Sequence, residues 1–346
     1  MDMSQPALDA LRADSAPSVT LRAPGRLHLG FLDPAASLGR RFGSLGLVIE
    51  GFETEVALSA ASANHVTATG VAERAEIERA RAHLQRLQQH STRHAPLHLR
   101  LLRVLPAHAG FGSGTQLALA IGRAFAQWHG LDIATPALAQ WLGRGARSGI
   151  GIAGFDHGGL LVDGGPGGSG GQVTSAPLLA RQPLPDAWRI LVVQDGAQRG
   201  LSGADERDAI ATLAPLPQAL AADICHQVLM RVLPGAASTE FAPFATGINH
   251  IQQLLGAHFA PAQGGSAYTS AAVGRLLDWI GAADHRAAIG QSSWGPTGFA
   301  ILPSQAQAEA VVEAARAANV LATGLTLTIV AGRNQGATVT DLRRAR

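Results

Sequence analysis

The sequence predicts an α+β fold with two domains, and three observations support this prediction. A chain of 346 residues is long enough to form two hydrophobic cores. The first half mixes strand and helix patterns, whereas the second half is mostly helical. The second half then closes with a strand–helix–strand pattern. We therefore expect domains at residues 18–200 and 201–346, preceded by a flexible polar tail over residues 1–17.

The individual elements follow from apolar periodicity and turn residues. Thr135 and Pro136 mark a helix start, as N-cap and first helical residue. In the first half we predict strands at Val19–Ala23, Leu47–Glu50 and Glu53–Ser59, a helix at Ala75–His90, a strand at Leu97–Leu105, helices at Leu117–Trp128 and Thr135–Arg147, and strands at Leu160–Val162 and Trp188–Gln194. In the second half we predict helices at Ala204–Leu213, Pro217–Leu233, Phe241–Phe259 and Ser270–Trp279, then a strand at Phe299–Leu302, a helix at Ala308–Ala318 and a strand at Thr326–Val330.

The segment Pro106–Gln116 predicts a phosphate-binding loop. An extended apolar segment runs into this glycine-rich turn, and a long helix follows directly. Glycines let the backbone approach an anion, and the N–H groups of a helix N-terminus favour negative charge. The loop is not a Walker A motif, because all 27 basic residues of the chain are arginine. The candidate phosphate ligands of this loop are Gly110, Gly112, Ser113, Gly114, Thr115 and Gln116.

The composition argues against several classes of function. A net charge of +2, the lack of a basic run and 5% aromatic residues argue against a nucleic-acid partner. No apolar run reaches the length of a membrane span, so we expect no membrane partner. The single cysteine, Cys225, excludes an internal disulfide and predicts a reducing, cytoplasmic location. The chain has no lysine for Schiff-base chemistry, so cationic roles belong to arginine, which suits phosphate and carboxylate groups.

Three glycine-rich motifs resemble those of the GHMP superfamily, which includes the galacto-, homoserine, mevalonate and phosphomevalonate kinases. Pro106–Gln116 resembles the phosphate loop of this superfamily, and Gly149–Gly159 resembles its stretch with an active-site aspartate, here Asp156. Gln291–Gly298 resembles its third, C-terminal glycine motif. The resemblance implies a two-domain GHMP-kinase-like fold, with a ribosomal S5 domain 2-like N-terminal domain and a ferredoxin-like α+β C-terminal domain.

Within the superfamily, the sequence resembles the β-ribofuranosylaminobenzene 5′-phosphate synthase family. This family resemblance lies in Pro24–Asp33, Gly39–Gly46, Pro106–Gln116, Gly143–Gly165, Arg199–Glu206 and Gln291–Thr297. It implies a decarboxylating transfer in which phosphoribosyl pyrophosphate and 4-aminobenzoate give the C-riboside, CO₂ and pyrophosphate. That reaction is a step toward tetrahydromethanopterin-type one-carbon carriers. The resemblance also implies dependence on Mg²⁺ and a homodimer, while the metal ligands stay unidentified.

An ATP-dependent GHMP small-molecule kinase is the alternative hypothesis. By resemblance, such kinases hold Mg²⁺ with a glutamate upstream of the active-site aspartate, but no Asp or Glu occurs from Ala134 through Phe155. Arg144 and Arg147 instead lie at i and i+3 on the predicted helix. Arginines repel Mg²⁺ and attract anions, which favours the synthase. A non-catalytic regulator that binds phosphorylated metabolites is a third hypothesis, and the three intact glycine motifs argue against it.

The candidate catalytic residues are Asp156, His28 and Asp33. Asp33 is equally a candidate turn residue, because Pro34 follows it. A carboxylate such as Asp156 or Asp33 would stabilise positive charge at the ribosyl carbon as pyrophosphate leaves. His28 shares a strand face with Arg26, so it is a candidate ligand of the acceptor carboxylate or of a phosphate. The other candidate ligands of substrate and phosphate are Arg26, Arg41, Arg144, Arg147, Arg199, Ser293, Gly295 and Thr297.

Overall fold

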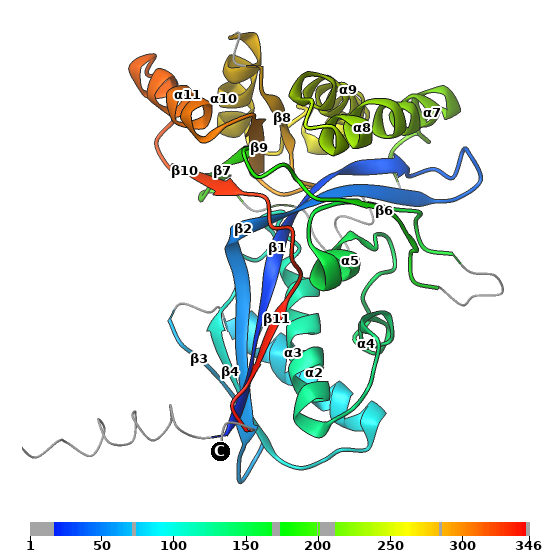
Figure 1. The fold of residues 1–346 in the computed structure, drawn as a ribbon, viewed down its shortest axis with the longest axis vertical. Helices are drawn as coiled ribbons and strands as arrows, with labels where there is room; N and C mark the ends of the chain where they lie inside the picture. Colours follow the sequence, from blue (N-terminus) through cyan, green and yellow to red (C-terminus); the bar gives the residue numbers. More distant parts are fainter. Residues whose placement is uncertain are drawn as a thin grey trace, which may run out of the picture.

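The computed structural model contains two β-sheets with their helices, in the predicted α+β arrangement (Figure 1). It describes residues 17–70, 74–167, 174–198, 200, 212–283 and 286–343. Three predictions fall wholly or mostly outside these residues: the tail before Pro17, the helix at Ala204–Leu213 and the ligand Arg199. Of the helices described, none combines the length and the apolar character that a bilayer crossing requires.

The first sheet is built on two long paired strands, β1 (Ser18–Asp33) and β2 (Phe42–Ala60). Its main path is β11-β1-β2-β4-β3, while β5 pairs with β2 and β6 pairs with β5. The separate strands predicted at Leu47–Glu50 and Glu53–Ser59 form one continuous strand, and Gly51 between them lies inside β2 with a φ of 76°. The remaining strands of this sheet are β3 (His65–Ala68), β4 (Leu97–Arg103), β5 (Leu160–Asp163), β6 (Leu178–Gln182) and β11 (Thr338–Asp341).

Helices cover one face of the first sheet and bury its apolar side chains (Figure 1). They are α2 (Arg74–Ser91), α3 (Ser113–His129), α4 (Thr135–Trp141) and α5 (Ile150–His157). Phe125 of α3 is fully buried in a cluster with Leu21 of β1 and Leu99 of β4. Burial of this apolar stripe fixes the position of α3, whose N-terminus forms part of the cleft described below.

The second sheet has the order β10-β7-β9-β8, with every pairing antiparallel. Two helices pack on one face through apolar residues such as Leu277 and Val311. The other face packs against the remaining helices and the first sheet. The strands are β7 (Arg189–Asp195), β8 (Ala288–Gln291), β9 (Thr297–Leu302) and β10 (Leu325–Ala331). The helices are α7 (Gln218–Gln227), the π-helical η1 (Val228–Val232), α8 (Leu233–Ala237), α9 (Phe241–Phe259), the 3₁₀ turn η2 (Ala260–Gln263), α10 (Ala271–Ala282) and α11 (Gln305–Ala317).

The two sheets do not divide at residue 200, where the sequence predicted the domain boundary. Strand β7 precedes that residue but belongs to the second sheet, and β11 returns to pair with β1 in the first. One apolar cluster also joins Leu27 and Leu45 of the first sheet to Val192 and Ile248 of the second domain. Each domain is therefore built from separated stretches of chain, because the chain crosses between the sheets before β7 and again after β10.

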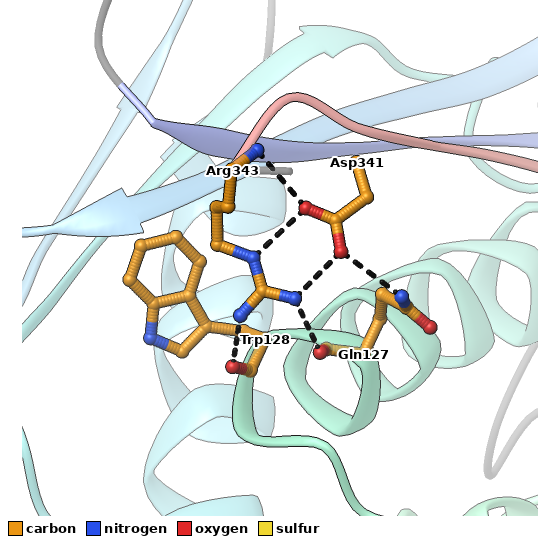
Figure 2. A network of polar contacts seen from close by, with 4 residues as sticks. All are labelled: Gln127, Trp128, Asp341 and Arg343. Carbon is orange, nitrogen blue, oxygen red and sulfur yellow. Dashed lines mark hydrogen bonds and ion pairs between the residues drawn. The ribbon is translucent and has the colours of Figure 1, made fainter. Parts of the chain in front are cut away.

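Hydrogen bonds join the C-terminal segment to the end of α3 (Figure 2). The guanidinium of Arg343 donates from Nη2 to the carbonyl of Gln127 at 2.8 Å, and from Nη1 to the carbonyl of Trp128. Asp341 Oδ2 lies 2.6 Å from the same Nη2 and accepts a hydrogen bond from Gln127 Nε2 at 3.0 Å. A cation at the carbonyl end of a helix is favourable. Arg343 is also the main reason that the pKa of Asp341 lies below its usual range.

We expect Arg343→Ala to lower the free energy of unfolding by about 1–2 kcal/mol near neutral pH. Because the pKa of Asp341 is lower in the folded than in the unfolded protein, the part of this stabilisation that comes from the Asp341 ion pair is present above about pH 4 and is lost below it. Urea unfolding of both proteins across this range measures the difference. The control is Arg81→Ala, an exposed arginine paired with Glu78, which should cost less than about 0.5 kcal/mol. A difference that does not change with pH would contradict this account.

Candidate functional site

A cleft of about 630 Å³ opens where the predicted motifs meet. Its walls come from β1, from the loop before α3 and from residues 143–148 between α4 and α5. The third glycine motif contributes one further residue. The predicted site residues that line the cleft are Arg26, His28, Gly110, Gly112, Ser113, Gly114, Thr115, Arg144, Arg147 and Ser293.

The phosphate loop meets α3 in a conformation that favours glycine. Gly110 has a φ of 95°, and Gly112, the N-cap of α3, has a φ of 74°. The N–H of Thr115 donates to the carbonyl of Gly112 at 3.0 Å, and no side chain caps the N–H groups of the first turn before it. Ser113 and Gly114 of the first turn line the cleft. An uncapped helix N-terminus in a glycine-rich loop is the arrangement that binds phosphate groups.

Two arginines flank this helix N-terminus. A methyl group added at Gly112 would lie 2.9 Å from Arg26 Cζ, and one added at Gly114 would lie 3.3 Å from Arg144 Nη1. Arg26 Nη1 also donates to the carbonyl of Gly110 at 3.2 Å, which holds this guanidinium beside the loop. Guanidinium groups and helix N–H donors both favour an anion, so together they form a stronger anion site than either alone.

Arg144 and Arg147 lie on an irregular segment, and the prediction that places them on one helix face is wrong. Helix α4 ends at Trp141. Gly143 and Gly145 then have φ values of 67° and 88°, which are left-handed conformations that end a helix. This irregular backbone brings both arginines to the cleft from outside any helix.

Arg79 of α2, which belongs to none of the predicted motifs, completes the cationic wall. It lines the cleft, and its Nη2 donates to Glu76 Oε1 at 2.8 Å. Arg79 and Arg86 add to the effect of burial in lowering the pKa of Arg144. Burial is also the main cause that lowers the pKa of His83 to about 4, so this histidine is neutral near pH 7. The i, i+4, i+7 spacing of Arg79, His83 and Arg86 is a sequence signal for one shared helix face.

The third glycine motif is hydrogen-bonded both to the phosphate loop and to β1. Ser292 Oγ donates to the carbonyl of Gly110 at 2.7 Å and accepts from the backbone N–H of His28 at 2.9 Å. The N–H of Ser293 donates to the carbonyl of His28 at 3.2 Å. A methyl group at Gly295 would lie 2.5 Å from Gly110 N, so only glycine allows this close approach. Three motifs far apart in the sequence are thus fixed to one another.

His28 lies on the cleft wall as a neutral imidazole. Its side chain is 3% exposed. Burial, reinforced by Arg26 and Arg147, lowers the pKa of His28 to about 3. At neutral pH it therefore carries no charge to attract the acceptor carboxylate or a phosphate.

The two candidate catalytic carboxylates do not line the cleft. Asp156 is exposed at the C-terminal end of α5, where it accepts a hydrogen bond from Thr135 Oγ1 at 2.6 Å. Asp33 is buried and closes the turn after β1, accepting from the N–H of Leu38 at 2.7 Å and from Ser37 Oγ at 3.2 Å. The structure thus brings neither carboxylate together with the phosphate loop.

The remaining predicted ligands lie behind or beside the cleft wall. Gln116 is buried, and its Nε2 donates to the carbonyl of Gly151 at 2.9 Å, which ties α3 to α5. Arg41 donates to the carbonyl of Pro34 at 3.2 Å and lines a separate pocket. Thr297 is buried at the start of β9. Gln116 and Thr297 are therefore buried outside the cleft lining, and Arg41 faces a different pocket. Gly295 packs on the phosphate loop.

The described lining of the cleft offers no carboxylate to a metal ion. Across the described residues, no group of three His, Cys, Asp or Glu side chains is placed to hold one. The donors present are guanidinium groups, backbone N–H groups and hydroxyls, which suit an anion, whereas Mg²⁺ prefers oxygen ligands with negative charge. These residues therefore do not fit a protein-held Mg²⁺.

Comparisons with known proteins identify the family of the chain. Residues 76–159 match the GHMP kinases N terminal domain, and residues 236–321 match the GHMP kinases C terminal domain. A beta-ribofuranosylphenol 5'-phosphate synthase of Archaeoglobus fulgidus is 33% identical over 296 residues, covering 83% of this chain and 88% of the relative. A protein of the same name from Methanothermobacter thermautotrophicus is 30% identical and covers 92% and 97%. The structure of homoserine kinase from Cytophaga hutchinsonii covers 98% of this chain and 99% of its own, with a TM-score of 0.63 at 16% identity.

The solved structure confirms the predicted fold, and the two synthases identify the branch. Their name specifies a phenol product, where the sequence resemblance implied an aminobenzene product. The match over most of both chains indicates an enzyme. This chain belongs to the GHMP superfamily and, within it, to the family of the beta-ribofuranosylphenol 5'-phosphate synthases.

Proposed function

We propose that this enzyme transfers the ribosyl 5-phosphate group of phosphoribosyl pyrophosphate to a para-substituted benzoate, with loss of CO₂. The observation that best supports the proposal is the cationic cleft wall, where Arg26 and Arg144 flank the N-terminus of α3 and Arg79 and Arg147 lie on the same lining. Phosphoribosyl pyrophosphate carries phosphate groups at both ends of the sugar, so it needs several such contacts. The name of the relatives specifies a product of this kind.

In this proposal the N-terminus of α3 binds the pyrophosphate, together with Arg26 and Arg144. Negative charge builds up on the leaving pyrophosphate as the C1–O bond of the sugar stretches. N–H and guanidinium groups that are already in place stabilise this charge more in the transition state than in the ground state. Arg79 and Arg147, which line the same cleft, bind the 5-phosphate in this proposal.

The acceptor reacts through the ring carbon that bears its carboxylate. That carbon forms the bond to C1 of the sugar, driven by the lone pair of a para hydroxyl or amine, while the C1–O electron pair leaves with pyrophosphate. The electron pair of the carbon–carboxylate bond then returns to the ring as CO₂ departs. This scheme needs no protein nucleophile. The Mg²⁺ that the family resemblance implies would be held by pyrophosphate oxygens.

The same observation weighs against the alternative, an ATP-dependent kinase. A carboxylate that holds Mg²⁺ on ATP is absent from the described lining of the cleft, and Arg144 lies beside the helix N-terminus. A positive side chain there repels a metal ion and attracts an additional anion.

The test is to incubate the purified protein with phosphoribosyl pyrophosphate, Mg²⁺ and either 4-hydroxybenzoate or 4-aminobenzoate. We expect release of pyrophosphate that depends on the benzoate, and a product whose mass equals the C-riboside phosphate. Parallel reactions with ATP and homoserine or mevalonate test the kinase. ATP turnover without pyrophosphate release from the ribosyl donor would reject the proposal.

A further inference from the structure

A small side pocket opens from the cleft beside His28. It shares His28, Phe31 and Ser293 with the cleft, and apolar side chains such as Phe259 and Trp294 form its walls. Its volume is about 40 Å³, against about 630 Å³ for the cleft. Since a space of about 10–15 Å³ by this measure holds one water, the pocket admits only a few atoms.

The amide side chains around the side pocket are already bonded to the protein. Gln252 donates to the carbonyl of Leu29 at 2.6 Å and accepts from the N–H of Gln291 at 2.9 Å. The side chain of Gln291 donates to Gln263 Oε1 and to the carbonyl of Ser293, both at 2.8 Å. These groups hold the walls in place, so they are not the polar contacts that a ligand would use.

The imidazole of His28 differs from these amides, because its Nε2 is buried and has no hydrogen-bond partner. A neutral imidazole carries its proton on one ring nitrogen and presents a lone pair at the other, so with the proton on Nδ1 the unpartnered Nε2 is a hydrogen-bond acceptor. The edge-on contact with Phe31, at 4.6 Å between ring centroids, helps to fix the orientation of the ring. A buried acceptor without a donor is costly, so a ligand that supplies a donor is favoured there.

We propose that the side pocket receives the para substituent of the aromatic acceptor, whose O–H or N–H group donates a hydrogen bond to His28 Nε2. This inference rests on the proposed function. The carboxylate-bearing carbon, at the opposite end of the ring, then points back into the cleft toward the ribosyl donor. The apolar side chains at the pocket mouth contact the ring.

The contact with His28 matters most as the carbon–carbon bond forms. The para substituent donates its lone pair into the ring at that stage, so its O–H or N–H group becomes more positive. The neutral Nε2 stabilises that charge through the hydrogen bond, without taking the proton. Loss of CO₂ returns the electron pair to the ring, and the substituent ends with the proton that it started with. His28 thus acts as an acceptor-recognition residue that contacts the substrate directly.

The experiment compares 4-hydroxybenzoate and 4-aminobenzoate with 4-methoxybenzoate as acceptors. A methoxy group donates electrons to the ring about as well as a hydroxyl, but it is larger and has no proton to donate. We expect kcat/KM for 4-methoxybenzoate to be lower by about 10²-fold or more. Comparable turnover of all three acceptors would overturn the inference.

Variants of His28 provide the second arm. His28→Gln keeps an acceptor atom, whereas His28→Leu removes it, so we expect His28→Leu to lose about tenfold more kcat/KM for 4-hydroxybenzoate. Equal losses would overturn the assignment of Nε2. If His28→Leu does not fold, the wild-type acceptor series still decides the question.

Calorimetric titration of the wild-type protein separates failure of this inference from failure of the proposed function. With no turnover of any acceptor, the proposed function fails. Tighter binding of 4-hydroxybenzoate than of 4-methoxybenzoate would then still support the pocket, and equal binding would reject it.

Discussion

Arg144→Ala is expected to lower kcat/KM for the phosphorylated donor by about 10²–10³-fold, the largest loss among single arginine variants of the cleft. Its guanidinium lies at the start of α3, 3.3 Å from the position of a methyl group on Gly114. In the variant, only one arginine would remain beside the helix N-terminus to stabilise the negative charge on the departing pyrophosphate. Steady-state kinetics with varied donor concentration measure the loss.

The matched control for this variant is Arg316→Ala, on the exposed surface of α11. Arg316 pairs with Glu313 there, and both side chains are more than half exposed. We expect its kinetics to equal those of the wild type. Arg144→Lys should recover only part of the activity, because lysine keeps the charge but loses the two-pronged contact of a guanidinium. Wild-type kinetics in the Arg144→Ala enzyme would show that pyrophosphate does not bind beside Arg144.

Gly112→Ala is expected to lower activity by about 10²-fold while costing only about 1 kcal/mol of stability. The new methyl group would lie 2.9 Å from Arg26 Cζ, so the guanidinium must move away from the helix N-terminus. Movement of a flexible side chain is cheap for folding, but it removes a positioned charge from the cleft. Kinetics and urea unfolding on the same preparation measure both effects.

Gly130 at the other end of α3 provides the control. It is the C-cap of the same helix, with a φ of 64° compared with 74° for Gly112, and a methyl group there would meet nothing within 4 Å. Gly130→Ala should therefore cost a similar amount of stability and leave activity unchanged. Equal activity losses in both variants would show that Gly112 acts through the helix rather than through Arg26.

The parts of the site that the sequence predicted correctly depend on local patterns. The phosphate loop is a contiguous glycine-rich turn before an apolar helix, and Ser113–His129 forms that helix. Arg26 and His28 alternate on one strand, and both line the cleft. Such features are set by neighbouring residues, so the chain shows them directly.

The parts that the sequence did not predict depend on contacts between distant residues. Gly143 and Gly145 end α4 early, and helical periodicity alone does not show that they adopt left-handed conformations. Asp156 matched a motif, but only the packing of α5 shows that it lies away from the cleft. Strand β11 is short, and its pairing with β1 joins opposite ends of the chain.

The role of Arg79 in the site also depends on contacts between residues that are distant in the sequence. The pattern of α2 shows a charged helix face, but it does not say what that face contacts. Only the tertiary fold brings this face to Arg144. Burial lowers the pKa of Arg144, and the nearby Arg79 and Arg86 lower it further. A cluster of like charges in a cleft indicates a ligand of opposite charge.

The most direct test of the central claim is the release of ¹⁴CO₂ from carboxyl-labelled 4-hydroxybenzoate and 4-aminobenzoate, measured together with pyrophosphate. The account predicts that labelled CO₂ appears only when phosphoribosyl pyrophosphate is present, in an amount equal to the pyrophosphate, and that Arg144→Ala slows both products together. Retention of the label with both acceptors, or pyrophosphate release without CO₂, would contradict the assignment of this cleft as a decarboxylating ribosyl-transfer site.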